Sequence, residues 1–131
     1  ANPAFVHCAT EDGRVLAFDP RAPGRPAAAF AAHPKGVSAL AFSPGAPGLL
    51  ATASVDKTVR LWDLADPTTS SPPLVAEKNL QAGKLFAAAF SPDAPFLLAA
   101  AGDRGLAALW HCDELEGVRR RFGPRVAGHD A

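Results

Sequence analysis

Histidine and cysteine side chains are the groups in this sequence best suited to bind a metal or to attack a substrate. The chain has four histidines and two cysteines, and two adjacent pairs occur, His7-Cys8 and His111-Cys112. Neighbouring residues of a strand point to opposite faces of a sheet, so neither pair can direct both side chains at one ion. No Cys-x-x-Cys spacing occurs. We therefore predict no metal site and no cofactor.

The arrangements that nucleophilic or phosphate chemistry requires are also missing. Serine, aspartate and histidine are present, but no Gly-x-Ser-x-Gly elbow holds a serine as a nucleophile. The stretch Gly102-Asp103-Arg104-Gly105 lacks the lysine and the following helix of a phosphate loop, and it is typical of a β-turn. We predict that the chain is not an enzyme.

One run of positive charge stands near the C-terminus. It consists of Arg119, Arg120 and Arg121, with Arg125 just beyond. Such a run either lies on a solvated last strand and tail or contacts phosphates or an acidic partner. Acidic residues upstream can neutralise it locally, namely Asp113, Glu114 and Glu116.

The composition limits what kind of protein this can be. The chain has 131 residues, a formal net charge of zero and 48% hydrophobic residues, which suits one globular domain or a piece of a larger one. The balanced charge argues against a nucleic-acid coat, and no apolar run approaches the ~18 residues of a membrane span. Two cysteines are too few for a disulfide scaffold, so we expect free thiols in a reducing compartment. Since the chain opens with Ala1 and contains no methionine, we expect it to be processed or excised from a longer product.

Short apolar runs separated by turn residues fill most of the sequence. Runs such as 4–9 and 14–18 flank an Asp-Gly step that is typical of a hairpin, and another short run, 118–122, closes the series. No helical stretch is expected. The pattern predicts an all-β chain of about eleven strands.

The sequence repeats itself. Ala41-Phe42-Ser43-Pro44 recurs 48 residues later as Ala89-Phe90-Ser91-Pro92, and Trp62 recurs at the same offset as Trp110. Phe18 precedes Trp62 by 44 residues. A period of 44 to 48 residues, with about four strands in each unit, is typical of β-propeller blades.

The segment from Leu50 to Asp63, with the sequence LATASVDKTVRLWD, resembles the core of a WD repeat. The resemblance implies a partial β-propeller built from four-stranded antiparallel blades. It places an incomplete first blade at 4–31, without its innermost strand, a second at 37–77 and a third at 85–122, followed by a tail at 123–131. Because a closed propeller usually needs more than three blades, we expect an open or oligomeric fragment, or a piece of a larger propeller whose remaining blades are its partners.

The same resemblance implies a polar series in the second blade. In WD blades a histidine from the loop between blades, a strand hydroxyl, a turn aspartate and the tryptophan are hydrogen-bonded one to the next. The matching residues here are His33, Thr52, Asp56 and Trp62, and the implied role is structural rather than catalytic. The other blades are degenerate at these positions, with Cys8, Asp12 and Phe18 in the first blade and Asp103 and Trp110 in the third.

Basic residues collect in the loops that join one blade to the next and in the turns between the two middle strands of a blade. In a propeller these loops open on one face. They carry Lys35, Lys57, Lys78, Lys84 and Arg104, alongside Glu11, Asp12, Asp56 and Asp103. With Asp12 and Asp56 used in turn bonding and Asp103 capping its own turn, we expect this candidate binding face to be basic. The alternative is that its lysines are ordinary solvated turn residues.

A narrower resemblance comes from stretches outside the WD core. Phe18-Asp19-Pro20-Arg21, Ser91-Pro92-Asp93-Ala94-Pro95-Phe96 and Arg121-Phe122-Gly123 are similar to the C-terminal repeats of the periodic tryptophan protein 1 family. That resemblance implies a protein-interaction scaffold in ribosome biogenesis and ribosomal-RNA gene expression, in the nucleus and nucleolus, with pre-ribosomal particles as partners. The chain departs from the family in its missing early blades, its missing acidic N-terminal region and the lost aspartate after Trp110.

A second function remains open. Phe18-Asp19-Pro20-Arg21 also looks like the degenerate Trp-Asp-x-Arg box of substrate receptors for cullin–RING ubiquitin ligases. Trp62-Asp63-Leu64-Ala65 lacks that arginine, so only the first blade matches. The sequence therefore offers two classes of partner, pre-ribosomal proteins and the propeller adaptor of such a ligase.

Overall fold

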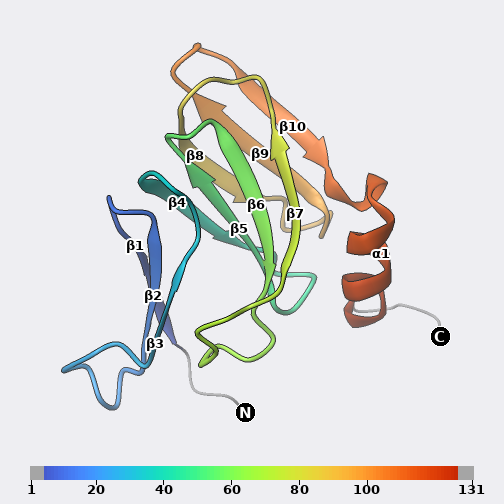
Figure 1. Cartoon of the computed structure of the whole chain (residues 1–131). Helices are drawn as coiled ribbons and strands as arrows, with labels where there is room; N and C mark the ends of the chain where they lie inside the picture. Colours follow the sequence, from blue (N-terminus) through green and yellow to red (C-terminus); the bar gives the residue numbers. More distant parts are fainter. Residues whose placement is uncertain (1–4, 127–131) are drawn as a thin grey trace.

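The computed structural model describes residues 5–126, and ten strands in three antiparallel sheets account for most of them (Figure 1). The first sheet contains β1 (Val6–Ala9), β2 (Arg14–Phe18) and β3 (Ala28–Ala31). The middle sheet contains β4 (Val37–Phe42), β5 (Leu49–Ser54), β6 (Thr58–Asp63) and β7 (Leu74–Asn79). The third sheet contains β8 (Leu85–Phe90), β9 (Leu97–Gly102) and β10 (Ala107–His111). The prediction of an all-β class is confirmed, and the sheets follow one another as blades of a partial propeller.

The repeat in the sequence is also a repeat in strand register. Leu49 pairs with Asp63 across β5 and β6, and Leu97 pairs with His111 across β9 and β10, at an offset of 48 residues. A register shift near the start of β4 recurs at the equivalent place in β8. The same backbone is therefore built twice, although many side chains differ.

Two apolar layers hold the three sheets together. One layer lies between the middle and third sheets, where Leu61, Leu85 and Leu98 are buried. The other lies between the first and middle sheets, where the ring of Phe30 packs 4.9 Å from that of Trp62, measured between centroids. Because alternate residues of a strand face opposite sides of a sheet, the middle sheet supplies side chains to both layers.

The third sheet has three strands, and the chain after β10 is helical, which corrects two expectations. After the 3-10 turn η1 (Cys112–Glu114), the segment predicted as a strand at 118–122 forms the helix α1 (Glu116–Phe122), followed by η2 (Gly123–Arg125). A strand would place Arg120 on the same face as Val118 and Phe122. In the helix Val118 and Phe122 lie on one side and are buried, while Arg120 is exposed. Within residues 5–126, only the middle sheet has the four strands expected of a complete blade.

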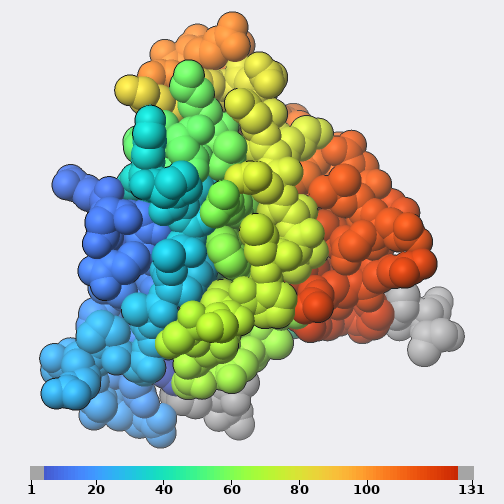
Figure 2. Space-filling view, viewed as in Figure 1, coloured from blue at the N-terminus to red at the C-terminus, as the bar shows by residue number. Residues whose placement is uncertain are grey.

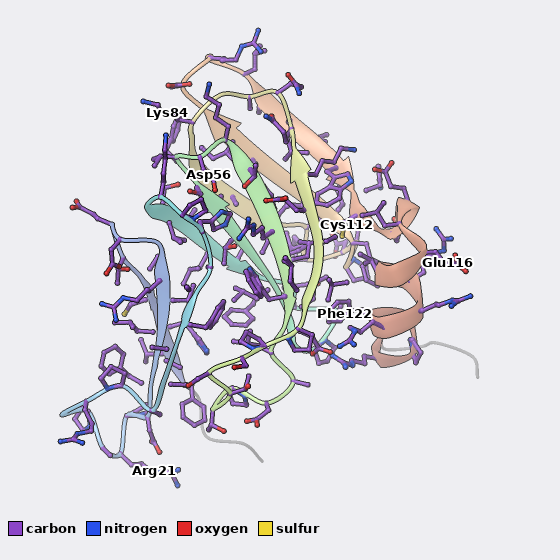
Figure 3. All side chains as sticks on the ribbon, viewed as in Figure 1. Arg21, Asp56, Lys84, Cys112, Glu116 and Phe122 are labelled. Carbon is purple, nitrogen blue, oxygen red and sulfur yellow. The ribbon has the colours of Figure 1, made fainter. Side chains whose placement is uncertain are left out.

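Helix α1 lies against the outer edge of the middle sheet, next to β7 (Figure 2). Phe122 is on the side of α1 that faces the sheets, and Glu116 is on the far side (Figure 3). The tail expected at 123–131 thus begins as η2. Residues 127–131 of that tail, and residue 4 at the expected start of the first blade, lie outside the described residues.

Antiparallel strands bring alternate loops to the same end of the molecule. The upper face in Figure 1 carries the connections 10–13, 32–36, 55–57, 80–84 and 103–106. The lower face carries 19–27, 43–48, 64–73, 91–96 and the C-terminal segment 112–126. No helix in the described part of the chain is long and apolar enough to cross a membrane.

Replacing Phe122 with alanine tests the packing of α1. We expect the free energy of unfolding to fall by roughly 3–5 kcal/mol, because removal of a fully buried ring leaves a cavity beneath the sheets. Arg120→Ala, on the exposed side of the same helix, is the control and should leave the midpoint of chemical denaturation almost unchanged. Equal midpoints for the two variants would contradict the burial of Phe122.

Candidate functional site

The polar series begins where the loop after β3 meets the turn between β5 and β6. His33 is buried in that loop, and its Nδ1 lies 2.9 Å from Oδ2 of Asp56. A close backbone contact fixes the loop, because Gly13 has a φ of +92° and a Cβ there would lie 2.0 Å from the carbonyl oxygen of His33. The carbonyl of Gly13 also accepts hydrogen bonds from the backbone N–H groups of Ala32 and His33. The first sheet therefore positions a histidine that acts in the second blade.

Two groups with a single hydrogen-bonding role set the direction of the series. The indole N–H of Trp62 can only donate, and it donates to Oγ1 of Thr52 at 2.9 Å. The ionised carboxylate of Asp56 can only accept, so the proton between it and His33 sits on Nδ1. Nε2 of His33 then accepts from the Thr52 hydroxyl at 2.8 Å. Each group is satisfied when His33 is the neutral tautomer with its proton on Nδ1.

Asp56 is tied to the turn that follows it as well as to His33. Its Oδ1 accepts from the backbone N–H of Thr58 at 2.9 Å and from the Thr58 hydroxyl at 2.6 Å. Partial burial raises the pKa of Asp56, but the hydrogen bonds from Thr58 and His33 outweigh that effect and hold the pKa below its usual value. The carboxylate is therefore an ionised acceptor at neutral pH.

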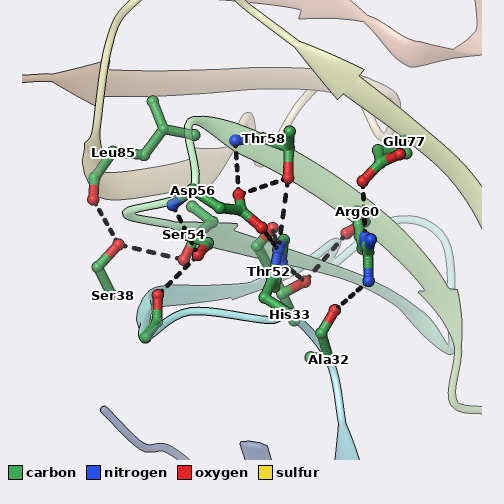
Figure 4. A network of polar contacts seen from close by, with 12 residues as sticks. Ala32, His33, Ser38, Thr52, Ser54, Asp56, Thr58, Arg60, Glu77 and Leu85 are labelled. Atoms are coloured by element: carbon green, nitrogen blue, oxygen red, sulfur yellow. Dashed lines mark hydrogen bonds and ion pairs between the residues drawn. The ribbon is translucent and has the colours of Figure 1, made fainter. Parts of the chain in front are cut away.

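Three residues that the sequence analysis did not single out extend this network, namely Thr58, Ser54 and Ser38 (Figure 4). The hydroxyl of Ser54 donates to the carbonyl of Gly36 at 2.7 Å, which joins the end of β5 to the loop after β3. The hydroxyl of Ser38 donates to the carbonyl of Leu85, which joins the middle sheet to the third. A threonine two residues after an aspartate is a turn signal that identifies Thr58 in retrospect, whereas the two serines carry no comparable signal.

In the first sheet the equivalent turn uses an arginine in place of the histidine. Asp12 accepts from the hydroxyl of Thr10 and from Nε of Arg14, the latter at 3.0 Å. Both charged side chains are at least half exposed, so their pair contributes little to stability. Cys8 is exposed at the position of the strand hydroxyl, and Phe18 has no polar group at the position of the tryptophan. The first sheet is consequently held by packing more than by a polar series.

In the third sheet the indole N–H of Trp110 donates to an acceptor outside the sheet. Ala100 stands at the position of Thr52 and offers no side-chain oxygen, and Nε1 of Trp110 donates to Oε1 of Glu114 at 2.8 Å. Nζ of Lys78 donates to the same oxygen at 2.9 Å and lies 5.3 Å from the centroid of the Trp110 ring. The hydrogen bonds from Lys78 and Trp110 hold the pKa of Glu114 below its usual value. Lys78 is thus bound within β7, which corrects its expected place in a loop of the candidate binding face.

The turn between β9 and β10 is fastened to the loop before β8. Oδ1 of Asp103 accepts from the backbone N–H of Lys84 at 3.0 Å, so this aspartate binds the neighbouring loop and does not cap its own turn as expected. Nη1 of Arg104 donates to the carbonyl of Gln81 at 3.2 Å. Gln81 lies 48 residues after His33, so the equivalent loop in this blade contributes its backbone where the second blade contributes an imidazole.

The aspartate after Trp62 is bound by the C-terminal segment, in a group that we call the C-terminal clasp, consisting of Asp63, Arg121 and Arg125. The carboxylate of Asp63 is nearly buried, and it accepts from Nη1 and Nη2 of Arg125, each at 2.8 Å, and from Nη1 of Arg121 at 3.0 Å. The hydrogen bond from Arg125 lowers the pKa of Asp63 against the opposing effect of partial burial. Bidentate arginine–carboxylate bonds of this kind are strong and directional, so they hold α1 and η2 beneath the middle sheet.

The four arginines of the positively charged run near the C-terminus therefore have separate contacts. Arg121 and Arg125 belong to the C-terminal clasp. Arg119 donates to two backbone carbonyl groups of η1, and Arg120 pairs with Glu116 one helical turn away. The alternative of a solvated last strand is wrong about the strand, because Arg119, Arg120 and Arg121 lie on helix α1, where they are exposed.

The structure places the other members of the candidate binding face on the upper face. Lys35, Lys57, Lys84 and Arg104 are exposed, and none of them forms a side-chain ion pair within residues 5–126. Glu11 is also exposed there. Since Asp12 and Asp56 are engaged within their own turns, positive charge predominates among the free side chains.

Metal and thiol chemistry have little support in the described part of the chain. No group of three histidine, cysteine, aspartate or glutamate side chains between residues 5 and 126 comes close enough to hold a metal ion. Burial raises the pKa of the Cys112 thiol to about 12, with a further contribution from Asp113, so this thiol is unreactive at neutral pH. Nε2 of His7 is buried without a hydrogen-bond partner, and its ring packs on Phe42 at 4.9 Å between centroids.

A known family matches part of this chain. The family described as WD domain, G-beta repeat matches residues 24–63, a segment that runs from the loop before β3 to the end of β6 and contains the whole series from His33 to Trp62. Residues 24–63 form a WD repeat.

Curated relatives match the chain around and beyond this WD repeat. An uncharacterized WD repeat-containing protein of Schizosaccharomyces pombe is 34% identical over 119 residues, which are 89% of this chain and 22% of that protein. Histone acetyltransferase type B subunit 2 of Aspergillus fumigatus is 39% identical over 70 residues, covering 48% of this chain and 16% of that protein. A DNA damage-binding protein of Phaeosphaeria nodorum is 37% identical over 59 residues, covering 45% of this chain and 11% of that protein. The chain spans about a fifth or less of the length of these relatives.

Asp56 is expected to be the costliest polar position of the WD repeat. Asp56→Ala leaves the buried Nδ1–H of His33 and the N–H of Thr58 without acceptors, so the free energy of unfolding should fall by roughly 2–3 kcal/mol. Asp12→Ala, at the equivalent but exposed turn, is the matched control and should cost clearly less. Urea denaturation midpoints measure both, and a midpoint for Asp56→Ala equal to that of the wild type would refute the role of the series.

The C-terminal clasp should make the stability of the protein depend on acid pH. The pKa of Asp63 is lowered from 3.8 in the folded state, so its contribution is complete above that value and is lost as the pH falls through the lower folded pKa. Asp63→Asn should therefore be less stable at neutral pH and should lose less stability on acidification, as measured by thermal melts between about pH 7 and about pH 2. Asp93→Asn, an exposed residue of the lower face, is the control and should follow the wild type. Parallel curves for Asp63→Asn and the wild type would exclude the clasp.

Proposed function

We propose that this chain is a non-enzymatic WD-repeat scaffold for protein–protein interaction. The observation that carries this proposal is the polar series. His33 and Asp56 are the groups best suited to acid–base chemistry, and they are bonded to each other, to Thr52 and to Thr58. Their hydrogen-bonding capacity is used to hold the blade together, so the exposed loops and sheet faces are left as the functional surfaces.

The setting that we propose is nucleolar ribosome biogenesis and ribosomal-RNA gene expression, with pre-ribosomal particles as partners and the nucleus and nucleolus as location. The support is the resemblance of residues 18–21, 91–96 and 121–123 to the periodic tryptophan protein 1 family. The first of these stretches forms an ordered corner, the second connects β8 to β9, and the third closes α1. Phe18-Asp19 and Ser91-Pro92 occupy positions that repeat in the middle blade, so the support comes from the remaining residues of these stretches.

We further propose that the blades at 4–31, 37–77 and 85–122 belong to a larger propeller whose remaining blades cover the outer face of the third sheet. Ala51 and Leu61 of the middle sheet are fully buried in the layer against the third sheet. Their counterparts 48 residues later, Ala99 and Leu109, lie on the outer face of the third sheet, and Leu109 is 69% exposed. A face with the same side chains in the same register suits the same kind of neighbour, which is another blade.

One observation favours the second candidate function, a substrate receptor of a cullin–RING ubiquitin ligase. Arg21 donates to the carboxylate of Asp19 through Nε at 3.1 Å and Nη2 at 2.9 Å, at an exposed corner of the lower face. Asp63, the matching aspartate of the second blade, is covered by the C-terminal clasp. A ligase adaptor would therefore meet an accessible aspartate–arginine pair in the first blade.

Affinity capture from nuclear extract with the tagged protein, followed by mass spectrometry, separates the two functions. Enrichment of pre-ribosomal proteins would support the scaffold in ribosome biogenesis. Enrichment of the propeller adaptor of a cullin–RING ligase, abolished by Arg21→Glu, would reject it in favour of the alternative.

Charge reversal at Lys35 and Lys57 together should weaken the captured complex in a salt-dependent way. The loss should be larger at about 0.1 M salt than at about 0.5 M, because salt screens exposed charges, and the melting temperature should change little. Arg25→Glu, an exposed position in a lower-face loop, is the matched control. Unchanged capture at low salt would mean that these lysines are only solvated turn residues.

A further inference from the structure

A hollow opens on the upper face, beside the inner edge of the middle sheet. Its volume is about 440 Å³. It is lined by the turn between β1 and β2, the start of β4 and the turn between β5 and β6, through Glu11, Gly36, Val37, Ser38 and Val55. The lining is apolar at the two valines, and the hollow is open to solvent.

Three lysines lie on the segments that form and adjoin this hollow. Lys35 immediately precedes the lining residue Gly36, and Lys57 follows Val55 in the same turn. The third cation comes from the neighbouring blade, because the hydroxyl of Ser38 reaches across to the residue after Lys84. Figure 3 shows Lys84 at the same end of the molecule as the Asp56 turn. The three lysines are exposed, so their charges are available to a partner.

An exposed aromatic side chain lies on the neighbouring sheet. Phe86 is 61% exposed and lies in the irregular start of β8, directly after the residue whose carbonyl accepts from Ser38. Apolar surface enclosed by like charges is typical of a site that binds a partner of opposite charge through a central apolar contact.

The mixture of charges favours a protein segment over a nucleic acid. The whole chain has no net charge, whereas domains that bind nucleic acid through its phosphate backbone are typically basic. Sites for single-stranded nucleic acid place successive aromatic platforms along a basic groove. The described residues that line this hollow include no aromatic side chain.

Building on the proposed scaffold function, we propose that the upper face binds an acidic protein segment that carries one large apolar side chain. That side chain enters the hollow between Val37 and Val55. The carboxylates on either side of it pair with Lys35, Lys57 and Lys84. The apolar contact fixes the position of the segment, and the lysines select its charge.

Two labelled peptides test this surface by fluorescence anisotropy with the full chain. One peptide has a central leucine flanked by aspartates and glutamates, and the other has serine in place of the leucine. We expect the leucine peptide to bind about tenfold more tightly. Lys57→Glu combined with Lys84→Glu should weaken its binding by about tenfold or more at about 0.1 M salt, and by less at about 0.5 M.

Glu11→Gln should act in the opposite direction and strengthen binding of the acidic peptide by a few fold, because it removes a like charge from the wall of the hollow. Arg25→Glu on the lower face is the matched control and should leave the Kd unchanged. Thermal melts show whether each variant is folded; Lys57 has a φ of +80°, and glutamate shares the backbone strain that lysine already bears there.

Three results would overturn the proposal. They are equal affinity for the leucine and serine peptides, no effect of the lysine reversals in a folded variant, and tighter binding of an RNA oligonucleotide that the same reversals abolish. The test is also separable from the capture experiment. Peptide binding with this residue dependence, in a protein that captures no pre-ribosomal proteins, supports the surface and rejects the ribosomal setting. If the lysine reversals do not reduce the capture of pre-ribosomal proteins, the result rejects the proposed surface alone.

Discussion

The middle blade depends on a series of hydrogen bonds whose two ends, Trp62 and Asp56, have fixed and opposite roles. The indole of Trp62 can only donate and the carboxylate of Asp56 can only accept, so the two groups between them, Thr52 and His33, must each donate once and accept once. Breaking any link leaves a buried polar group unpaired, which costs more free energy than the bond itself contributes. The loop after β3 is held in place for that reason, and the upper face takes its shape from that loop.

The three blades share a backbone more closely than they share a chemistry. Strand register and the irregular start of the first strand recur at 48 residues, yet the indole of Trp110 is satisfied by Glu114 from beyond the sheet, and Asp12 is satisfied by Arg14. The apolar layers and the turns specify where the strands lie. The polar partners only have to leave no buried donor or acceptor unpaired, and several side-chain combinations achieve this.

Much of the fold follows from the sequence because its signals are local. Hairpin turns, alternating apolar residues and the 48-residue offset lead to the sheets, and the resemblance to a WD repeat leads to His33, Thr52, Asp56 and Trp62. The segment 118–122 was misassigned because a run of five residues fits a strand as well as a helical turn, and only the burial of Val118 together with Phe122 decides between them. The pairing of Asp63 with Arg121 and Arg125 joins residues about sixty positions apart, and no local pattern encodes it. Ser38 and Ser54 were overlooked for a related reason, since an isolated serine does not show which carbonyl it will meet.

The C-terminal clasp also turns the last part of the chain into a closed loop. Asp63 ends β6 and its arginine partners lie in or after α1, so β7 and the whole third sheet fall between the two tied points. The third sheet cannot separate from the middle one as an independent unit while that tie holds. We therefore expect local opening of the third sheet to be coupled to the release of α1, so that the exposed outer face of the last blade belongs to a sheet that is tied to the middle blade at both ends.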